Sequence, residues 1–307
     1  MQEFAGKVAV VTGGANGIGK ALVERFVAEG MKAVIADIDE GMIEATTKEL
    51  QAAGHDVLGV ATDVTDLASV EALRDRALEA YGAVHVLCNN AGIGSGSEGH
   101  FWEHHVNDWR WSFDVNVMGV INGINAFVPT MLAQDTEGAV VNTTSGNGGF
   151  TPMINSAVYA TTKAAVTCLT ECLWGQLRET DAKVTAHLLY PSTQTPGLLK
   201  TGIWTPGKNR PSRYDRPGAP PSASGRDSLT PMLKRAEAVG QEIAWAPLSE
   251  VADLCFEGIR DDRFWICQPG AGEGSLARAQ SQADRSVPTY LIQGLNVMTG
   301  SKAGAKD

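Results

Sequence analysis

Cysteine is scarce in this chain of 307 residues, and its five cysteines form no C-x-x-C pair. That pattern favours reduced thiols and excludes a disulfide framework. Long apolar runs are also missing, because none reaches the length of a membrane span. The N-terminus leads directly into a strand-like run, so we expect no signal peptide. Together these absences predict a cytoplasmic protein without a membrane partner.

Basic charge is in short supply as well. The chain has 25 Lys and Arg against 35 Asp and Glu, a formal net charge of −10. Nucleic-acid binding needs a basic footprint, so we expect no nucleic-acid partner. Hydrophobic residues make up 43% of the chain. This share indicates a globular protein, and the length suits one large α/β domain or two small ones.

Two signals alternate through the first two-thirds of the chain. Short apolar runs lie at 8–11, 33–36, 57–61, 84–88, 139–142 and 184–189, and amphipathic stretches lie at 17–30, 40–53, 67–81, 106–133 and 156–179. Continuous apolar strands separated by helices predict a parallel sheet covered on both faces. We therefore expect an α/β fold with a doubly wound parallel sheet of about seven strands.

The composition changes from Pro191 onward, and nine of the thirteen prolines fall within 191–247. Residues 198–246 also carry eight Lys or Arg against four Asp or Glu. Such a long irregular segment is typical of a lid, a binding loop or a linker. We interpret 1–270 as one catalytic domain, 192–247 as an extended substrate-binding loop, and 271–307 as a polar tail. A helix near 249–260 and a strand near 264–267 are expected between loop and tail.

A glycine-rich turn follows the first predicted strand, in the stretch Thr12-Gly-Gly-Ala-Asn-Gly-Ile-Gly19. Glycines let the backbone approach a ligand closely, and the helix that follows offers free N–H groups to a pyrophosphate. The second strand ends at Asp37, where a carboxylate suits a ribose diol and repels a 2′-phosphate. The alternative is that Asp37 only ends a strand. We expect NAD(H) as the cofactor in preference to NADP(H).

Tyr159 and Lys163 are four residues apart, so on a helix they share one face. A fixed ammonium lowers the pKa of a nearby phenol from about 10 and makes it a general acid or base. The alternative for an isolated Y-x-x-x-K is a surface pair. The rest of the motif set decides in favour of catalysis.

These motifs resemble the short-chain dehydrogenase/reductase family over residues 5 to 195, and the resemblance implies a Rossmann-like fold. Besides the glycine turn and the Tyr159–Lys163 pair, it rests on Asp63-Val64, Asn89-Asn-Ala-Gly92, Asn116 and Ser145. It implies four catalytic residues, Asn116, Ser145, Tyr159 and Lys163. It implies cofactor contacts from Thr12, Gly13, Asn16, Gly17, Ile18, Gly19, Asp37, Ile38, Asp63, Val64, Asn90, Ala91, Gly92, Tyr159, Lys163, Pro191, Thr193 and Thr195.

Two departures from the family pattern have local consequences. Ser145 lies fourteen residues before Tyr159, one more than is usual, so we expect the loop between them to bulge. The usual Pro-Gly is Pro191-Ser192, which shifts the threonine that contacts the nicotinamide carboxamide. Thr193 and Thr195 are both options for that contact.

By resemblance, Tyr159 is the acid/base, Lys163 lowers its pKa and binds ribose, Ser145 polarises the substrate oxygen, and Asn116 holds a proton-relay water. The implied reaction is hydride exchange between a secondary alcohol and a ketone. The alternative is a non-catalytic NAD(H)-binding regulatory protein with the same fold. The family also implies a homo-oligomer, a tetramer or dimer.

Aromatic side chains gather in the two segments that would build the substrate pocket. They are Phe101, Trp102, Trp109 and Trp111 in the first, Trp204, Tyr214 and Trp245 in the second, with Phe150, Met153 and Ile154 near the catalytic tyrosine. They suit a bulky apolar, aromatic or cyclic substrate, although Trp109 and Trp111 equally suit helix packing. The basic charge of 198–246 would attract an anionic substrate group or form a solvated face. His100 and His104 have a zinc-like spacing, with His105 adjacent, but no third ligand is evident, so we expect no metal.

Overall fold

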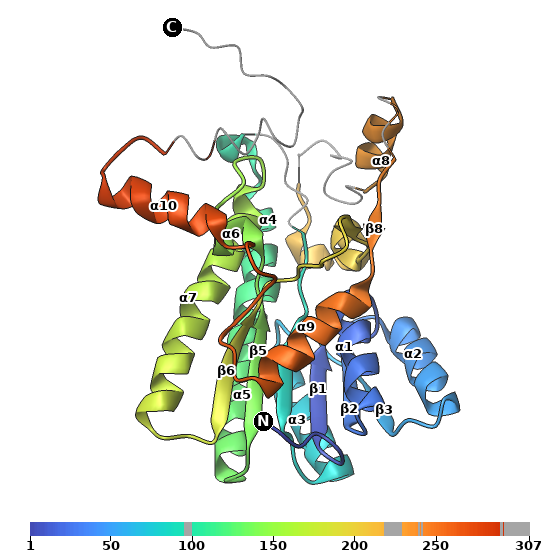
Figure 1. Cartoon of the computed structure of the whole chain (residues 1–307). Helices are drawn as coiled ribbons and strands as arrows, with labels where there is room; N and C mark the ends of the chain where they lie inside the picture. Colours follow the sequence, from blue (N-terminus) through green and yellow to red (C-terminus); the bar gives the residue numbers. More distant parts are fainter. Residues whose placement is uncertain (95–99, 218–228, 239, 241, 289–290, 292–307) are drawn as a thin grey trace, which may run out of the picture.

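A seven-stranded parallel sheet forms the centre of the computed structural model (Figure 1), which describes residues 1–94, 100–217, 229–238, 240, 242–288 and 291. The strand order is β3-β2-β1-β4-β5-β6-β9, and every neighbouring pair is parallel. The strands are β1 (Val8–Thr12), β2 (Lys32–Asp37), β3 (Val57–Ala61), β4 (Val86–Asn89), β5 (Gly138–Thr143), β6 (Val184–Leu189) and β9 (Trp265–Ile266). The doubly wound fold predicted from the apolar runs is confirmed.

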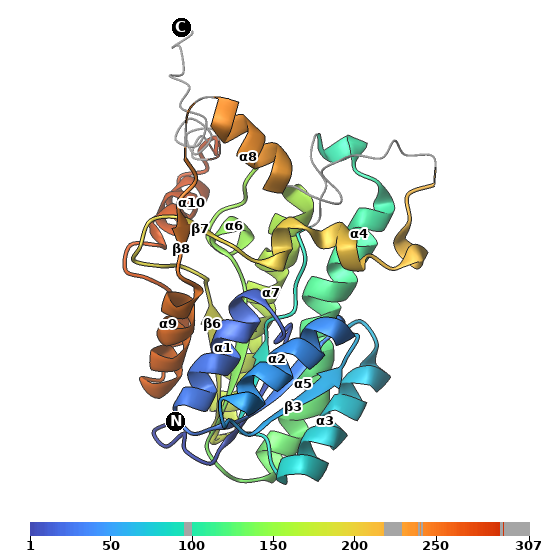
Figure 2. The same ribbon diagram turned by 90° about the vertical axis from the view of Figure 1, so that its right-hand side faces the viewer.

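Helices cover both faces of this sheet, as Figures 1 and 2 show. One apolar core joins the sheet to α1 (Gly17–Ala28), α2 (Glu40–Ala52) and α9 (Leu248–Arg260), and includes Phe26, Ile43 and Ile259. A second core joins it to α3 (Leu67–Tyr81), α5 (Gly119–Ala133) and α7 (Ala157–Glu179), and includes Leu73 and Phe127. The central strands are buried on both faces, which explains why they read as continuous apolar runs.

The predicted helix over 106–133 is one helical stretch with three parts. It contains α4 (Val106–Phe113), a π-helical turn at Asp114–Met118, and α5. By length and composition alone, this stretch is apolar enough to cross a membrane. However, 56% of its most apolar window is buried inside the protein. Ala126, Phe127, Val128 and Met131 of this stretch belong to the second core, which accounts for part of its hydropathy.

The proline-rich segment has more local structure than the sequence predicted. It contains the two-residue strands β7 (Leu198–Leu199) and β8 (Trp245–Ala246), which pair in parallel, and α8 (Leu229–Ala238). Three short 3-10 helices lie between β7 and residue 214. The predicted tail also holds a helix, α10 (Glu273–Ala283), and residues 292–307 lie outside the described part of the chain.

Candidate active site

The glycine turn opens the site at the carboxyl end of β1. Gly13 and Gly17 adopt positive φ angles of 63° and 56°, which favour glycine. A Cβ atom at Gly19 would lie 1.9 Å from the carbonyl oxygen of Gly13, so no other residue fits there. Helix α1 begins at Gly17 and directs its N-terminal N–H groups at the turn. The turn is therefore shaped to place backbone against a negatively charged ligand.

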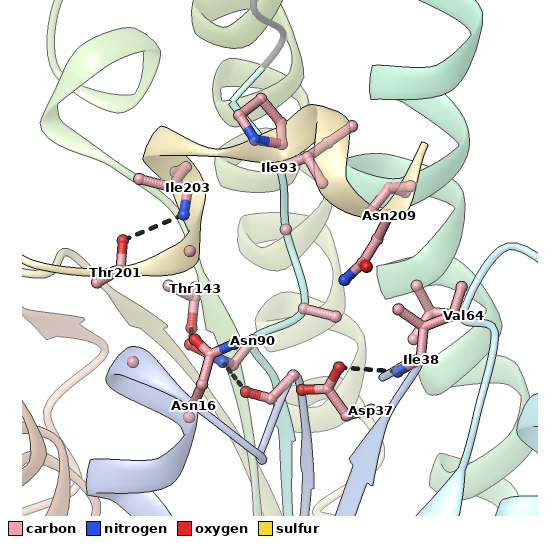
Figure 3. A pocket seen from close by; sticks show the side chains of 18 of the residues that line it. Asn16, Asp37, Ile38, Val64, Asn90, Ile93, Thr143, Thr201, Ile203 and Asn209 are labelled. Carbon is pink, nitrogen blue, oxygen red and sulfur yellow. Dashed lines mark hydrogen bonds between the residues drawn. The ribbon is translucent and has the colours of Figure 1, made fainter. Parts of the chain in front are cut away.

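Asp37 ends β2 beside this turn, and backbone N–H groups fix its carboxylate. Oδ2 accepts a hydrogen bond from the Ala15 N–H at 3.2 Å, and Oδ1 accepts from the N–H groups of Ile38 and Asp39 at 2.8 and 3.2 Å. Figure 3 shows Asp37 at the floor of the cleft, near the Ile38 backbone. A carboxylate held this way is ready to accept hydrogen bonds from a ribose diol.

Thr12 and Asn90 join β1 to β4 beneath the cleft. The Thr12 hydroxyl donates to the Cys88 carbonyl at 3.3 Å and accepts from the N–H groups of Asn90 and Ala91, both at 3.0 Å. The Asn90 side chain donates to the Thr12 carbonyl at 3.0 Å. The structure therefore gives Thr12, which the resemblance marked as a cofactor contact, a supporting position outside the lining of the cleft.

Tyr159, Lys163 and Ser145 come together where α7 passes the end of β5. The Ser145 side chain is close enough to the Tyr159 hydroxyl to act on the pKa of that phenol. The Lys163 ammonium lies 5.7 Å from the centre of the Tyr159 ring and donates to the Thr143 carbonyl at 2.9 Å. Lys163 is only 4% exposed. The three groups are thus in position for one proton-transfer site.

The lowered tyrosine pKa expected at this site is not found. Burial raises the pKa of Tyr159 to about 12, and the nearby Ser145 side chain only partly offsets that rise. Burial also lowers the pKa of Lys163 to about 8. Both shifts have one physical cause, because a low-dielectric environment disfavours the charged form of each group. In this arrangement desolvation outweighs the attraction between ammonium and phenolate.

Asn116 lies in the π-helical turn and is fully buried. Its side chain accepts a hydrogen bond from the Ile93 N–H at 2.8 Å and donates to the Ile93 carbonyl at 3.0 Å. A Cβ atom at Gly92 would lie 3.3 Å from the Asn116 Oδ1 and 3.5 Å from the Lys163 Nζ. Asn116 therefore fixes the turn that follows β4 directly beside the lysine.

The loop between Ser145 and Tyr159 begins with a distorted turn. The turn α6 (Gly146–Gly149) is distorted at Asn147 and at Gly148, whose φ is 99°. A Cβ atom at Gly148 would lie 2.0 Å from the carbonyl oxygen of Ala160. Glycine at this position lets the loop pack against α7 without displacing Tyr159.

One cleft connects the glycine turn, Asp37, Tyr159 and Lys163. Its lining includes fifteen of the residues implied by resemblance: Gly13, Asn16, Gly17, Ile18, Gly19, Asp37, Ile38, Asp63, Val64, Asn90, Ala91, Gly92, Tyr159, Lys163 and Pro191. Thr193 and Thr195 are not in this lining. The Thr193 hydroxyl donates to the Thr195 carbonyl at 2.9 Å, and the Thr195 N–H donates to Glu250 at 3.0 Å.

Residues 201–216, which we call the strap, lie within the segment 192–247 that we interpreted as a substrate-binding loop, and they cross the mouth of the cleft. The strap contributes Thr201, Gly202, Ile203, Thr205, Pro206, Asn209, Pro211 and Arg213 to the lining. Figure 3 shows Thr201, Ile203 and Asn209 reaching in from above. The strap carries part of the basic charge of 198–246, and four of its cations pair with carboxylates of the same chain. Lys208 lies 2.8 Å from Asp39, and Arg210 lies 2.7 Å from Asp108.

The aromatic residues expected around the substrate divide into two groups. Trp111 is 2% exposed and lines the cleft, and the nearby Tyr214 is also buried. In contrast, Phe101 and Trp102 are 61% and 79% exposed. Phe150 stacks on Tyr190 with ring centres 4.0 Å apart. Of the residues predicted to surround the substrate, the lining of the cleft includes Trp111.

The histidines of the zinc-like spacing contact aromatic rings. His100 stacks on Trp102 with ring centres 4.7 Å apart, and His104 lies 6.2 Å from Phe101 and 6.3 Å from Trp109. Within the described part of the chain, no group of three His, Cys, Asp or Glu side chains could hold a metal ion.

The fold and the cleft define an α/β protein built to hold a dinucleotide beside a tyrosine, and comparison with known proteins identifies the family. A family model described as short chain dehydrogenase matches residues 7–205. The chain belongs to this family of oxidoreductases.

Individual members of the family resemble the chain over most of its length. It is 31% identical over 273 residues to a CLA biosynthesis dehydrogenase/reductase of Lactiplantibacillus plantarum, covering 87% of this chain and 89% of that protein. It is 38% identical over 201 residues to a 2,5-dichloro-2,5-cyclohexadiene-1,4-diol dehydrogenase of Sphingobium indicum, covering 66% and 76%. A short chain dehydrogenase/reductase from Burkholderia phymatum, solved in complex with NAD, shares 40% identity with a TM-score of 0.82, covering 94% and 98%.

Proposed function

We propose that this protein is an NAD(H)-dependent oxidoreductase that interconverts a secondary alcohol and a ketone. One observation carries the proposal. Tyr159, with the Ser145 side chain beside its hydroxyl, lies in the same cleft as a glycine turn and the fixed carboxylate of Asp37. The cleft therefore combines the elements needed to bind a dinucleotide with a group that moves a proton.

The residues that fit the cofactor are the glycine turn and Asp37, and a bound nicotinamide would supply the exchange of hydride with substrate carbon. Tyr159 transfers the proton of the substrate hydroxyl, and Ser145 donates a hydrogen bond to the substrate oxygen. Lys163 binds the nicotinamide ribose and provides positive charge beside Tyr159. Asn116 holds the turn at Ile93, and we propose that it also binds the water of the proton relay. With a pKa near 12, Tyr159 is protonated at neutral pH and ready to donate to a ketone oxygen.

Asp37 supports NAD(H) over NADP(H), because a 2′-phosphate would meet its negative charge. Asp39, two residues further, adds a second carboxylate. Lys208 pairs with Asp39 at 2.8 Å and offsets only one of the two charges. We expect NADH to bind more tightly than NADPH in a direct fluorescence titration of the wild type. Tighter binding of NADPH would contradict this choice.

We propose a bulky apolar or cyclic substrate. Trp111, Ile93 and Ile203 give the cleft an apolar surface. The Sphingobium relative is named for a cyclic diol, which agrees with a ring-shaped substrate. A panel of cyclic and aromatic secondary alcohols, followed by nicotinamide absorbance, tests this class. We further propose a cytoplasmic homo-oligomer, a tetramer or dimer, which light scattering would detect.

The assignment of Tyr159 is tested by Tyr159→Phe. We expect this variant to keep its affinity for NADH and to lose turnover by a factor of at least about 100, because general acid/base catalysis contributes that much. Tyr81→Phe, a tyrosine on α3 remote from the cleft, is the control and should keep full activity. An active Tyr159→Phe enzyme would contradict the mechanism. Tight NADH binding without turnover in the wild type would favour a regulatory protein.

A further inference from the structure

The strap is anchored at its far end by a buried carboxylate. Asp108 is 2% exposed, and its Oδ1 accepts hydrogen bonds from Arg210 and Arg216, both at 2.7 Å. The Tyr214 hydroxyl donates to Asp114 at 2.6 Å. The Arg210 guanidinium also lies 4.9 Å from the centre of the Trp111 ring. These contacts attach the strap to α4 and to the π-helical turn, so its residues have a defined place over the cleft.

Arg213 leaves this anchor and reaches the other wall of the cleft. Its guanidinium donates to the Thr65 hydroxyl at 2.8 Å and to the Asp63 carboxylate at 3.3 Å. The guanidinium also lies over the ring of Tyr214, 4.8 Å from its centre. Asn209 also lines the cleft, and Figure 3 shows its amide pointing down into it.

The sheet order identifies which end of a dinucleotide would lie there. The glycine turn follows β1, and the catalytic residues lie on the β4–β5 side of it. Asp37 and Asp63 follow β2 and β3, on the opposite side. A dinucleotide with its pyrophosphate at the glycine turn and its nicotinamide at Tyr159 therefore extends its adenosine toward Asp63. Arg213 and Asn209 stand at that adenosine end.

We propose that Arg213, supported by Asn209, is an adenine-binding residue that the strap supplies to the cofactor site. This inference rests on the proposed function, since it concerns the same dinucleotide. A guanidinium is planar and stacks on aromatic rings, and the hydrogen bonds to Asp63 and Thr65 fix its orientation. The strap would then determine cofactor affinity through the adenine, in addition to covering the substrate.

A purely structural role for Arg213 would instead predict a lower melting temperature when its side chain is removed. The side chains of Arg213 and Asp63 are 53% and 30% exposed, and ion pairs this accessible contribute little to stability. Loss of Arg213 should therefore leave the melting temperature almost unchanged. Adenine stacking on a side chain is lost on truncation, so the effect should appear in ligand affinity.

The experiment measures binding of ADP-ribose, the cofactor without its nicotinamide, by titration calorimetry. We expect Arg213→Ala to bind it about tenfold more weakly than wild type, and Arg213→Lys to recover little because the ammonium is not planar. Arg178→Ala is the matched control. Arg178 is also 53% exposed, pairs with Asp262, and lies 5.5 Å from an aromatic ring, but on α7. It should bind ADP-ribose as the wild type does.

A second variant separates adenine binding from loosening of the strap. Asn107→Ala removes the 2.6 Å hydrogen bond from Asn107 to the carbonyl of Asp215, outside the cleft lining. It should keep wild-type affinity for ADP-ribose. Equal affinity in Arg213→Ala and wild type, or an equal loss in Asn107→Ala, would overturn the role of Arg213 alone. Absence of ADP-ribose binding to the wild type would overturn the proposed cofactor site and this role together.

Discussion

At the scale of single residues, burial dominates the chemistry of the Tyr159–Lys163 pair. Helical spacing suggested that the ammonium would lower the pKa of the phenol, but burial raises the pKa of Tyr159 to about 12 and lowers that of Lys163 to about 8. Both groups lose solvation, and each shift favours the neutral form. At neutral pH, Tyr159 is therefore neutral, whereas Lys163 still carries most of its charge.

The lowered pKa of Lys163 predicts a pH-dependent stability. Its ordinary pKa is 10.5, so between about pH 8 and pH 10.5 the unfolded chain binds a proton that the folded protein has released. The free energy of unfolding then rises with pH across this window, by about 3 kcal/mol. Urea unfolding at pH 7.5 and 10.5 should show the wild type gaining this amount relative to Lys163→Met. A difference between the two proteins that does not change with pH would contradict the assignment.

At the scale of elements, the packing of α5 against β4 depends on Gly123. A Cβ atom there would lie 2.0 Å from the Oδ1 of Asn89, a buried side chain that donates to Asn142 at 2.8 Å. The amide is held by this bond and by the sheet, so it has no room to retreat. The glycine thus lets helix and strand approach more closely than a side chain would allow.

Two Gly→Ala variants on different helices should shift stability in opposite directions. Gly123→Ala is expected to lower the free energy of unfolding by about 1–3 kcal/mol through overpacking. Gly175→Ala on α7 meets no atom within 4 Å and should raise it by about 0.5–1 kcal/mol, because alanine loses less backbone entropy in a helix. Denaturant unfolding measures both values, and a destabilised Gly175→Ala or a neutral Gly123→Ala would refute this account.

At the scale of the whole molecule, basic side chains of the strap form ion pairs with aspartates from other parts of the chain. The sequence left open whether the cations of 198–246 attract an anionic substrate or face solvent. In the structure, Lys208, Arg210, Arg213 and Arg216 all pair with aspartates of the first 110 residues. The charge asymmetry therefore serves intramolecular attachment of the strap at these four positions.

Among these ion pairs, those of the buried Asp108 should matter most for stability. Asp108→Ala leaves Arg210 and Arg216 without their shared carboxylate in a site where their side chains are 10% and 17% exposed. We expect a loss of about 3–5 kcal/mol and faster proteolysis within the strap. Asp75→Ala breaks an exposed pair with Arg74 and should cost less than about 1 kcal/mol. Similar losses in the two variants would show that the Asp108 anchor is no stronger than a surface pair.

The sequence alone was sufficient for the fold and for much of the cleft. Apolar runs predicted the parallel sheet because strands buried on both faces leave no polar positions. The glycine turn and Asp37 were recognisable because each lies at a strand end, and strand ends of a doubly wound sheet converge on one edge. These features depend on local pattern and on the order of elements, both of which a sequence records directly.

Only the tertiary structure determined how the strap is attached and how burial shifts the pKa values of Tyr159 and Lys163. Lys208 and Asp39 are 169 residues apart, and Arg213 and Asp63 are 150 apart, so no local pattern joins them. The shifted pKa values of Tyr159 and Lys163 likewise depend on desolvation by the surrounding chain, which spacing along a helix does not reveal. Motif order is a property of the linear chain, whereas long-range ion pairs and burial exist only after the chain has packed.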